Sequence, residues 1–381
     1  MKTNAAIIGH AGDEWTVREI ELREEVRPGE VLVRMAAAGL CHTDEHIRHG
    51  DLPARFPLAG GHEGSAVALA VGEGVRGIEP GDHLVLTFRP SCGLCAKCVE
   101  GKAHLCREIV KVQAGDEAPR LEDDGAPVNA QSLLATFSEH SIVPATSCVV
   151  VPKDIPLDVA ALLGCAVPTG YGAAVHAGEV TAGDRVIVVG TGGVGTNALQ
   201  GAKVAGAATV VAVDVSEQKL ALAERFGADV AFTSLVEAAD FVQSQNAGRK
   251  PNVIIVTVPV GAIVSEAVGL LDQSGRLVLA ALGDPARFRL DLPVNQLVMN
   301  DISVRGTVMG SSTLRHDIPT ILNLYRQGKF KLDELISHRF LLEEIRAGYE
   351  QLNRGDVIRA VIEYDDGADL GDVTEATADG V

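Results

Sequence analysis

Short apolar runs separated by turn residues fill the first part of the chain. The runs EVLVRMAAAG, SAVALAV and DHLVLTF are bounded by turn signals at Pro28-Gly29, Gly72-Glu73-Gly74 and Pro80-Gly81-Asp82. Short apolar runs between glycine and proline predict β-strands joined by tight turns. Residues 1–158 are therefore expected to form a β-rich domain.

The pattern changes after residue 159, where buried strands alternate with helices. The expected strands are RVIVVG (185–190), TVVAVDV (209–215), PNVIIVTV (251–258) and GRLVLAAL (275–282). The segments TNALQGAKVAGA and SEQKLALAERFG between them are expected to be helices. Alternating strands and helices predict an α/β fold with a doubly wound parallel sheet over residues 159–300.

The C-terminal part mixes helices with one closing strand, AVIEY. Residues 301–364 are assigned to the first domain as a segment that returns to it. From residue 365 to 381 the chain carries acidic residues and no basic ones, a composition that predicts a disordered tail.

Composition narrows the choice of partners and compartment. The 381 residues are 46% hydrophobic and carry a formal charge of −18, which argues against binding to nucleic acid or to an anionic membrane. The N-terminal apolar run is too short for a signal peptide, and no run reaches the roughly 18 apolar residues of a membrane span. Together with the odd number of seven cysteines, five of which have a better explanation than disulfides, this predicts a cytoplasmic protein.

Four cysteines lie within one short segment, CGLCAKCVEGKAHLC. Their spacing lets a single loop surround a closed, tetrahedral zinc site, with ligands Cys92, Cys95, Cys98 and Cys106. An iron–sulfur cluster of the ferredoxin type fits less well, because its fourth cysteine follows after a shorter gap and precedes a proline. A disulfide pair stays open as the weaker alternative.

A glycine-rich sequence directly follows one expected strand and precedes a helix. In that context GTGGVG predicts a dinucleotide-binding turn, which comprises Gly190, Thr191, Gly192, Gly193, Val194 and Gly195. Asp214 ends the next strand, where its carboxylate is expected to accept hydrogen bonds from ribose hydroxyls and to repel a 2′-phosphate. Lys219 is expected to contact the same ribose. The predicted cofactor is therefore NAD rather than NADP, with a turn acid or helix cap as the alternative role for Asp214.

Three further segments carry reactive side chains, but their spacing along the sequence does not show whether they meet in one site. They are CHTDEH (41–46), GGHEG (60–64) and the cysteine of LLGCAVPTGYGAAV. Taken singly, Cys165 would more often be a small buried residue, and His62 would more often be a core histidine with satisfied hydrogen bonds.

Taken together, these motifs resemble those of the zinc-dependent medium-chain alcohol dehydrogenases. The resemblance covers about residues 5 to 364 and rests on GLCHTDEH, GGHEG, the four-cysteine segment, LLGCAVPTGYG, VVGTGGVG and IRAVIEY in the same order. The chain is most similar to the actinobacterial branch that uses a nitrosoaniline dye as artificial electron acceptor. The resemblance implies a GroES-like catalytic domain beside a Rossmann domain.

The resemblance also implies roles for individual residues. Cys41, His62 and Cys165 would hold a catalytic zinc, Glu63 would lie behind the metal or bind it occasionally, and Asp44 would orient His62. The proton of the alcohol would pass to Thr43 and then to His46. The remaining implied contacts are His42 and Arg359 with the pyrophosphate, Val194 with the nicotinamide, and Leu52 and Phe88 with an apolar substrate.

The expected activity is transfer of hydride between a primary, apolar alcohol or its aldehyde and NAD, with two zinc ions per chain. Two alternatives stay open: a formaldehyde dehydrogenase acting on a thiol adduct, and an inactive zinc-binding relative. Relatives that keep a long connection like residues 106–137 tend to be dimers, so a homodimer is expected and a tetramer stays open. In the branch named above, NAD stays tightly bound and an external carrier reoxidises it.

Overall fold

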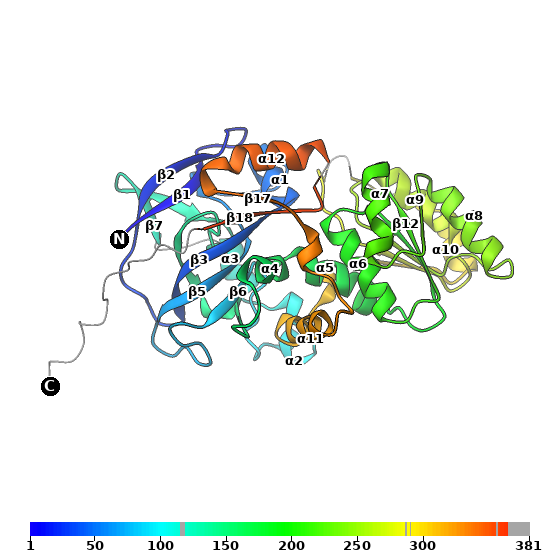
Figure 1. Ribbon diagram of the computed structural model, residues 1–381, viewed down its shortest axis with the longest axis horizontal. Coiled ribbons are helices and arrows are strands. Elements are labelled where there is room, and N and C mark those ends of the chain that lie inside the picture. Colours follow the sequence, from blue (N-terminus) through cyan, green and yellow to red (C-terminus); the bar gives the residue numbers. More distant parts are fainter. Residues whose placement is uncertain (115–118, 286–287, 290, 356, 365–381) are drawn as a thin grey trace.

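The computed structural model describes residues 1–114, 119–285, 288–289, 291–355 and 357–364 (Figure 1). The predicted acidic tail, residues 365–381, lies outside the described residues. Two β-sheet structures form one end of the molecule in Figure 1, and a layered α/β unit forms the other end.

The β-rich part contains a small closed barrel and a larger sheet. The barrel follows the order β1 (Lys2–Ile8), β2 (Thr16–Leu22), β7 (Leu121–Asp123), β8 (Ala126–Ala130) and β4 (Leu58–Ala59). The sheet follows the order β10 (Cys148–Val151), β6 (His83–Thr87), β5 (Glu63–Val71), β3 (Glu30–Leu40), β18 (Arg359–Glu363) and β17 (Ile336–Phe340), with β9 (His140–Pro144) also paired to β3. The long connection at 106–137 thus supplies the β7–β8 hairpin that completes the barrel.

The α/β part is a six-stranded parallel sheet. Its order is β13 (Val230–Phe232), β12 (Thr209–Val213), β11 (Arg185–Val189), β14 (Val253–Val256), β15 (Arg276–Leu279) and β16 (Ser303–Gly306). This is the strand order 3-2-1-4-5-6 of the dinucleotide-binding fold. Its helices are α6 (Gly193–Val204), α7 (Glu217–Ala223), α8 (Leu235–Gln245), α9 (Gly261–Leu270) and α10 (Val294–Met299). The last strand of this sheet, β16, begins at Ser303, so the sheet extends beyond residue 300, where the sequence pattern ended the α/β domain.

Small residues join the two parts at the centre of Figure 1, where α5 (Ala166–Gly172) packs against α6. A Cβ atom on Gly170 would lie 2.1 Å from the carbonyl oxygen of Val194, so only glycine permits this approach. Among the described residues no single helix is long and apolar enough to cross a membrane, and Leu157–Gly164 with Ala166–Ala177 meet the length and composition only as a pair bent by 55°.

Five more helices complete the β-rich part and its connection to the α/β part. They are α1 (His42–His49), α2 (Ala96–Val99), α3 (Ile109–Ala114), α11 (Leu314–Arg326) and α12 (Ile345–Arg354), and α4 (Leu157–Ala161) precedes α5. The helix α12 is amphipathic and buries Ile345, Tyr349 and Leu352 against the first strands. It thereby covers the region where β3 ends and α1 begins.

Candidate active site and metal centres

Strand register brings four distant segments to one edge of the larger sheet. Ala360 of β18 pairs with Leu40 of β3, and Gly64 of β5 pairs with Ala38 of β3. Glu63 pairs in turn with Thr87 of β6. Because antiparallel partners lie side by side, the residues just beyond these pairs are neighbours: Cys41, His62, Phe88 and Arg359.

Three metal-binding side chains converge at this edge. One ligand atom each from Cys41, His62 and Cys165 lies within 4.8 Å of the other two. The Nε2 atom of His62 is buried and has no hydrogen-bond partner. Gly164 permits the approach of Cys165, since a Cβ at Gly164 would lie 2.5 Å from the carbonyl oxygen of Leu86. Two thiols and one free imidazole nitrogen form a donor set that fits zinc with a fourth position open.

A buried hydrogen-bond network fixes the orientation of the His62 ring. Asp44 Oδ1 lies 2.6 Å from His62 Nδ1, and it also accepts a hydrogen bond of 2.6 Å from Gln131 Nε2. Tyr349 donates to Asp44 Oδ2 at 3.0 Å. Burial alone would lower the pKa of His62, but the Asp44 carboxylate raises it. The carboxylate therefore favours a proton on Nδ1 and leaves Nε2 to face the thiols.

Gln131 and Tyr349 were not anticipated from the sequence. They come from a 3₁₀ turn and from α12, far along the chain from Asp44, and neither belongs to a local motif. No sequence spacing relates them to the metal ligands. Only the packing of α12 over α1 brings the Tyr349 hydroxyl to the carboxylate.

Glu63 and Arg359 form an ion pair behind the converging donors. The Glu63 carboxylate binds Arg359 Nη2, and it accepts a hydrogen bond of 3.4 Å from the backbone N–H of Ala166. Glu63 is not one of the three converging ligands. Burial would lower the pKa of Arg359, but the charges of Glu63, Cys41 and Cys165 raise it. Arg359 thus keeps its positive charge, and the Glu63 carboxylate pairs with it.

Arg359 also reaches the glycine-rich turn. A Cβ atom on Gly193 would lie 2.5 Å from Arg359 Cδ and 3.3 Å from Nη1, so the guanidinium lies directly against that turn. The Nε atom of Arg359 is buried and has no hydrogen-bond partner. The predicted contact of Arg359 with a pyrophosphate stays a prediction, since one end of the guanidinium is already paired with Glu63.

Thr43 and His46 lie on one face of α1, because residues three apart in a helix are neighbours. The thiol of Cys41 lies 3.6 Å from Thr43 Oγ1, which places this hydroxyl beside the converging donors. His46 Nδ1 lies 2.9 Å from Asp51 Oδ2, and the His46 side chain is 25% exposed. Thr43 thus lies beside the buried donors and His46 is partly exposed, with Asp51 as its unanticipated partner; the proton path between them stays a prediction.

Of the two predicted pocket residues, Phe88 lies beside the metal donors. Its ring meets the His62 ring edge-on, with centroids 5.3 Å apart and an interplanar angle of 81°. Leu52 follows α1, and its N–H donates to the carbonyl oxygen of His46 at 3.2 Å. Its half-buried side chain has no described contact with the donors, so its role in the pocket stays a prediction.

The glycine-rich turn has the shape that a dinucleotide requires. Gly190 has a φ of +90°, and a Cβ on Gly195 would lie 1.7 Å from the Gly190 carbonyl oxygen, so neither position admits a side chain. At Gly192, by contrast, a Cβ would meet nothing within 4 Å. This open side lies at the N-terminus of α6, where free N–H groups and the helix dipole favour phosphate.

The Asp214 carboxylate already accepts hydrogen bonds from the glycine-rich turn. Its Oδ2 accepts hydrogen bonds from the N–H of Thr191 at 2.7 Å and from Thr191 Oγ1 at 3.0 Å, and its Oδ1 accepts one from the N–H of Ser216 at 3.0 Å. A carboxylate offers about four acceptor positions. One position therefore remains for a ribose hydroxyl, and a second would become free if the Thr191 hydroxyl rotated away.

His42 begins α1 of the β-rich part, and Lys219 lies on α7 of the α/β part. The pKa of His42 is lowered, first by the surrounding protein, which disfavours its charged form, and then by the positive charge of Lys219. A neutral imidazole is therefore favoured at His42. Its predicted contact with a pyrophosphate would then act through a hydrogen bond rather than through charge.

We expect Asp214→Ser to narrow the preference for NAD over NADP. The carboxylate would repel a 2′-phosphate in a partly desolvated site, and serine removes that repulsion. Kd values for both cofactors should be measured by fluorescence titration, with Asp240→Ser, an exposed change on α8, as the control. Equal binding of NAD and NADP by the parent protein would contradict this role.

The side chains of the four-cysteine segment also converge. The sulfur atoms of Cys92, Cys95, Cys98 and Cys106 all lie within 4.8 Å of one another. The backbone N–H groups of Arg107 and Cys98 lower the pKa of Cys95 to about 6. All seven cysteines of the chain are free. Four sulfur atoms at this separation, with no disulfide among them, fit a closed tetrahedral zinc site.

Changing Cys95 to Ser should lower the thermal stability and remove one zinc equivalent per chain, because a closed site contributes to folding rather than to chemistry. Cys148→Ser makes the same chemical change at another buried cysteine and should keep the full zinc content. Metal analysis and thermal unfolding of both variants test this. A Cys95→Ser protein as stable as the parent, with unchanged zinc, would argue against the assignment.

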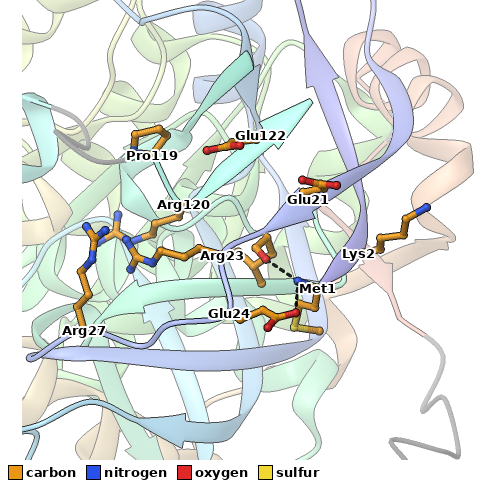
Figure 2. Close-up of a pocket in the computed structure, with 10 residues that line it drawn as sticks. Met1, Lys2, Glu21, Arg23, Glu24, Arg27, Pro119, Arg120 and Glu122 are labelled. Carbon is orange, nitrogen blue, oxygen red and sulfur yellow. Dashed lines mark hydrogen bonds and ion pairs between the residues drawn. The ribbon is translucent and has the colours of Figure 1, made fainter. Parts of the chain in front are cut away.

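A surface pocket near the N-terminus contains none of the predicted site residues (Figure 2). The side chains of Arg23, Arg27 and Arg120 gather on one side of it, as Figure 2 shows. Glu30 forms ion pairs with Arg23 and Arg120. Arg27 lies 3.4 Å from Glu25, and the pair of Arg23 with Glu30 joins the residue just after β2 to the first residue of β3.

Comparisons with known proteins agree with this geometry. The alcohol dehydrogenase GroES-like domain matches residues 27–153, and the zinc-binding dehydrogenase domain matches residues 193–327. The NDMA-dependent alcohol dehydrogenase of Amycolatopsis methanolica is 41% identical over 367 residues, which cover 95% of this chain and 99% of that protein.

Two solved structures extend the likeness to the fold. The alcohol dehydrogenase zinc-binding domain protein from Burkholderia ambifaria is 30% identical with a TM-score of 0.89, and benzyl alcohol dehydrogenase from Acinetobacter calcoaceticus is 28% identical with a TM-score of 0.85. Each match covers 95% of this chain and 99% of the other. An S-(hydroxymethyl)glutathione dehydrogenase from Paracoccus denitrificans is more distant, at 32% identity.

The chain therefore belongs to the zinc-dependent medium-chain alcohol dehydrogenases. Within that family it groups with the branch of NDMA-dependent, or nitrosoaniline-acceptor, alcohol dehydrogenases. The predicted fold class, the oxidoreductase activity on alcohols and the zinc and NAD cofactors are confirmed at the level of the family.

Proposed function

We propose that this chain oxidises a primary, apolar alcohol, or reduces the corresponding aldehyde, at a zinc held by Cys41, His62 and Cys165. The observation that carries the proposal is the buried, unpartnered Nε2 of His62 beside two free thiols. A buried polar atom without a partner is costly, and a metal ion removes that cost.

When bound, zinc would lower the pKa of an alcohol hydroxyl and NAD would accept the hydride. Residues of the chain itself transfer the proton of the alcohol to solvent. Thr43 Oγ1, beside Cys41, accepts the proton of the alcohol and donates its own proton onward. His46 then exchanges that proton with solvent, and the Asp51 carboxylate holds its ring in place.

Two further features adapt the site to this reaction. Phe88 packs edge-on to His62 and keeps water from one side of the pocket. Arg359, paired with Glu63, lies between the metal ligands and the glycine-rich turn, so its guanidinium contributes to binding the cofactor. The seven free cysteines support a reducing, cytoplasmic location.

The direct test is alcohol oxidation by the purified protein with two acceptors. Benzyl alcohol should be oxidised with added NAD or with a nitrosoaniline dye. If the cofactor stays bound, denatured protein will release NAD(H) and the dye will support turnover without added NAD. A zinc-loaded protein that oxidises no alcohol with either acceptor would contradict the proposed function.

The homodimer is also part of the proposal. Among the described strands, β16 pairs only with β15 and so forms one edge of the parallel sheet. The helix α10, just before it in the chain, exposes Val294, Val298 and Met299, the last of them by 80%. Exposed apolar side chains beside a free sheet edge support association of two copies. Val298→Lys should then shift the sedimentation coefficient toward that of a monomer.

A further inference from the structure

Gln131 bridges two groups that determine where the His62 ring lies. The residue is only 4% exposed, and its amide makes a hydrogen bond on each side. Oε1 accepts from the backbone N–H of Gly61, the residue before His62, at 2.9 Å. Nε2 donates at 2.6 Å to Asp44 Oδ1, the same oxygen that lies 2.6 Å from His62 Nδ1. One side chain thus contacts both the loop that carries this ligand and the carboxylate that orients its ring.

The chemistry of these two partners calls for an amide between them. A backbone N–H can only donate a hydrogen bond, and an ionised carboxylate can only accept one. The side chain between Gly61 and Asp44 must therefore offer an acceptor on one side and a donor on the other. A glutamate would place a second carboxylate against Asp44, and an apolar side chain would leave the buried N–H of Gly61 without a partner.

The backbone that follows Gln131 adopts a conformation that is rare for residues with side chains. Ser132, Leu133 and Ala135 have φ angles of +54°, +58° and +48°, in the left-handed region that residues other than glycine seldom occupy. Such conformations cost free energy and persist only where the surrounding structure imposes them. This turn therefore needs an account of what holds it and of what it serves.

The end of the turn is bonded to the loop that carries His62. The N–H of Thr136 donates to the carbonyl oxygen of Gly61 at 3.2 Å, and the N–H of Phe137 donates to that of Gly60 at 3.0 Å. A Cβ atom on Gly61 would lie 2.3 Å from Thr136 Oγ1, so the two segments are in direct contact. The left-handed turn thus lets the Gln131 side chain reach the same loop that its own backbone already contacts.

Building on the proposed function, we propose that Gln131 is a positioning residue that keeps His62 Nε2 directed at the thiols of Cys41 and Cys165. It supplies no ligand atom and takes no part in the transfer of hydride or of the proton. Tyr349 holds the other oxygen of Asp44, so the carboxylate is fixed from two sides. Without the Gln131 amide, the ring and its loop move more freely relative to the thiols, and the site holds a metal ion less firmly.

The test measures how fast zinc leaves each of the two metal sites. Zinc-loaded protein is mixed with an excess of a chelator that changes colour when it binds zinc, and the phase of release that is missing in Cys165→Ala belongs to the catalytic site. Gln131→Met keeps the length of the side chain and removes both hydrogen bonds. Because the loss of such a partner weakens metal binding about 10- to 100-fold, the catalytic phase should be faster by about that factor. The phase of the four-cysteine segment should keep the parent rate.

Two further variants support the interpretation. Gln131→Glu keeps the acceptor for the Gly61 N–H but replaces the donor to Asp44 with a second carboxylate, so it should also release the catalytic zinc faster. Gln200→Met is the matched control, because Gln200 is a buried glutamine on α6 whose amide also bridges a donor and an acceptor. Its partners are the backbone N–H and carbonyl oxygen of Lys331, at 2.7 and 3.0 Å. This variant loses the same kinds of hydrogen bond away from the metal and should release zinc at the parent rate.

The outcomes separate this inference from the proposed function. Release of the catalytic zinc at the parent rate from Gln131→Met and Gln131→Glu would overturn this inference alone. If both variants unfold where Gln200→Met does not, or if both phases of release become equally faster, Gln131 serves the fold in general and the inference is also wrong. A zinc-loaded parent protein that oxidises no alcohol would overturn the proposed function, while the rates of zinc release would still decide the role of Gln131.

Discussion

Cys165→Ala is expected to abolish alcohol oxidation while leaving cofactor binding nearly intact. Loss of a thiolate weakens the catalytic metal site, and the Lewis acid supplies several kcal/mol of stabilisation, so kcat should fall by at least about 1000-fold. The glycine-rich turn and Asp214 lie on other elements and keep their geometry. Turnover of benzyl alcohol and NAD titration on the same sample measure the two effects.

Cys148→Ala is the matched control. Cys148 is also buried, its burial raises the pKa of its thiol to about 12, and it belongs to neither group of converging ligands. This variant should lose some stability from the smaller side chain but keep its activity. A Cys165→Ala protein with activity close to that of the parent would contradict the assignment of the metal ligands.

Thr43→Ala is expected to slow alcohol oxidation by about 100- to 10,000-fold while keeping the metal. The variant removes the hydroxyl that lies 3.6 Å from Cys41 Sγ and therefore removes the proton acceptor. The defect should be greatest at low pH, since hydroxide replaces the missing acceptor as the pH rises. Rates of alcohol oxidation between about pH 6 and pH 9 measure this effect.

His46→Gln provides the comparison. His46 is partly exposed and only relays the proton, so water replaces it in part and the defect should be milder. If both variants oxidise alcohols at the parent rate across this pH range, the proposed proton path is wrong. The metal assignment would survive that result, because neither residue is one of the converging ligands.

Local motifs made parts of this protein predictable from the sequence. The cysteines of the four-cysteine segment lie close together in the sequence, so their spacing alone indicated a shared metal ion. The glycine-rich turn was equally clear, because its steric demands fall on residues a few positions apart, such as Gly190 and Gly195. Four strands of the parallel sheet were predicted within a few residues, and the two edge strands β13 and β16 were missed.

The second metal site could not be derived from spacing, because long-range strand pairing creates it. Cys41 and Arg359 become neighbours only through the pairing of β3 with β18, and resemblance to a family was needed to anticipate this. The partners of Asp44 show the same limit, since Gln131 and Tyr349 reach it from distant segments. The 106–137 connection carried a loop composition, yet it forms the β7–β8 hairpin.

The zinc content of the purified protein tests the central claim most directly. Metal analysis should find two zinc ions per chain in the parent, one in Cys165→Ala and one in Cys95→Ser, with alcohol oxidation lost in the Cys165 variant. A parent chain that oxidises alcohols with only one zinc, or a Cys165→Ala protein that keeps both zinc ions and its activity, would contradict the account.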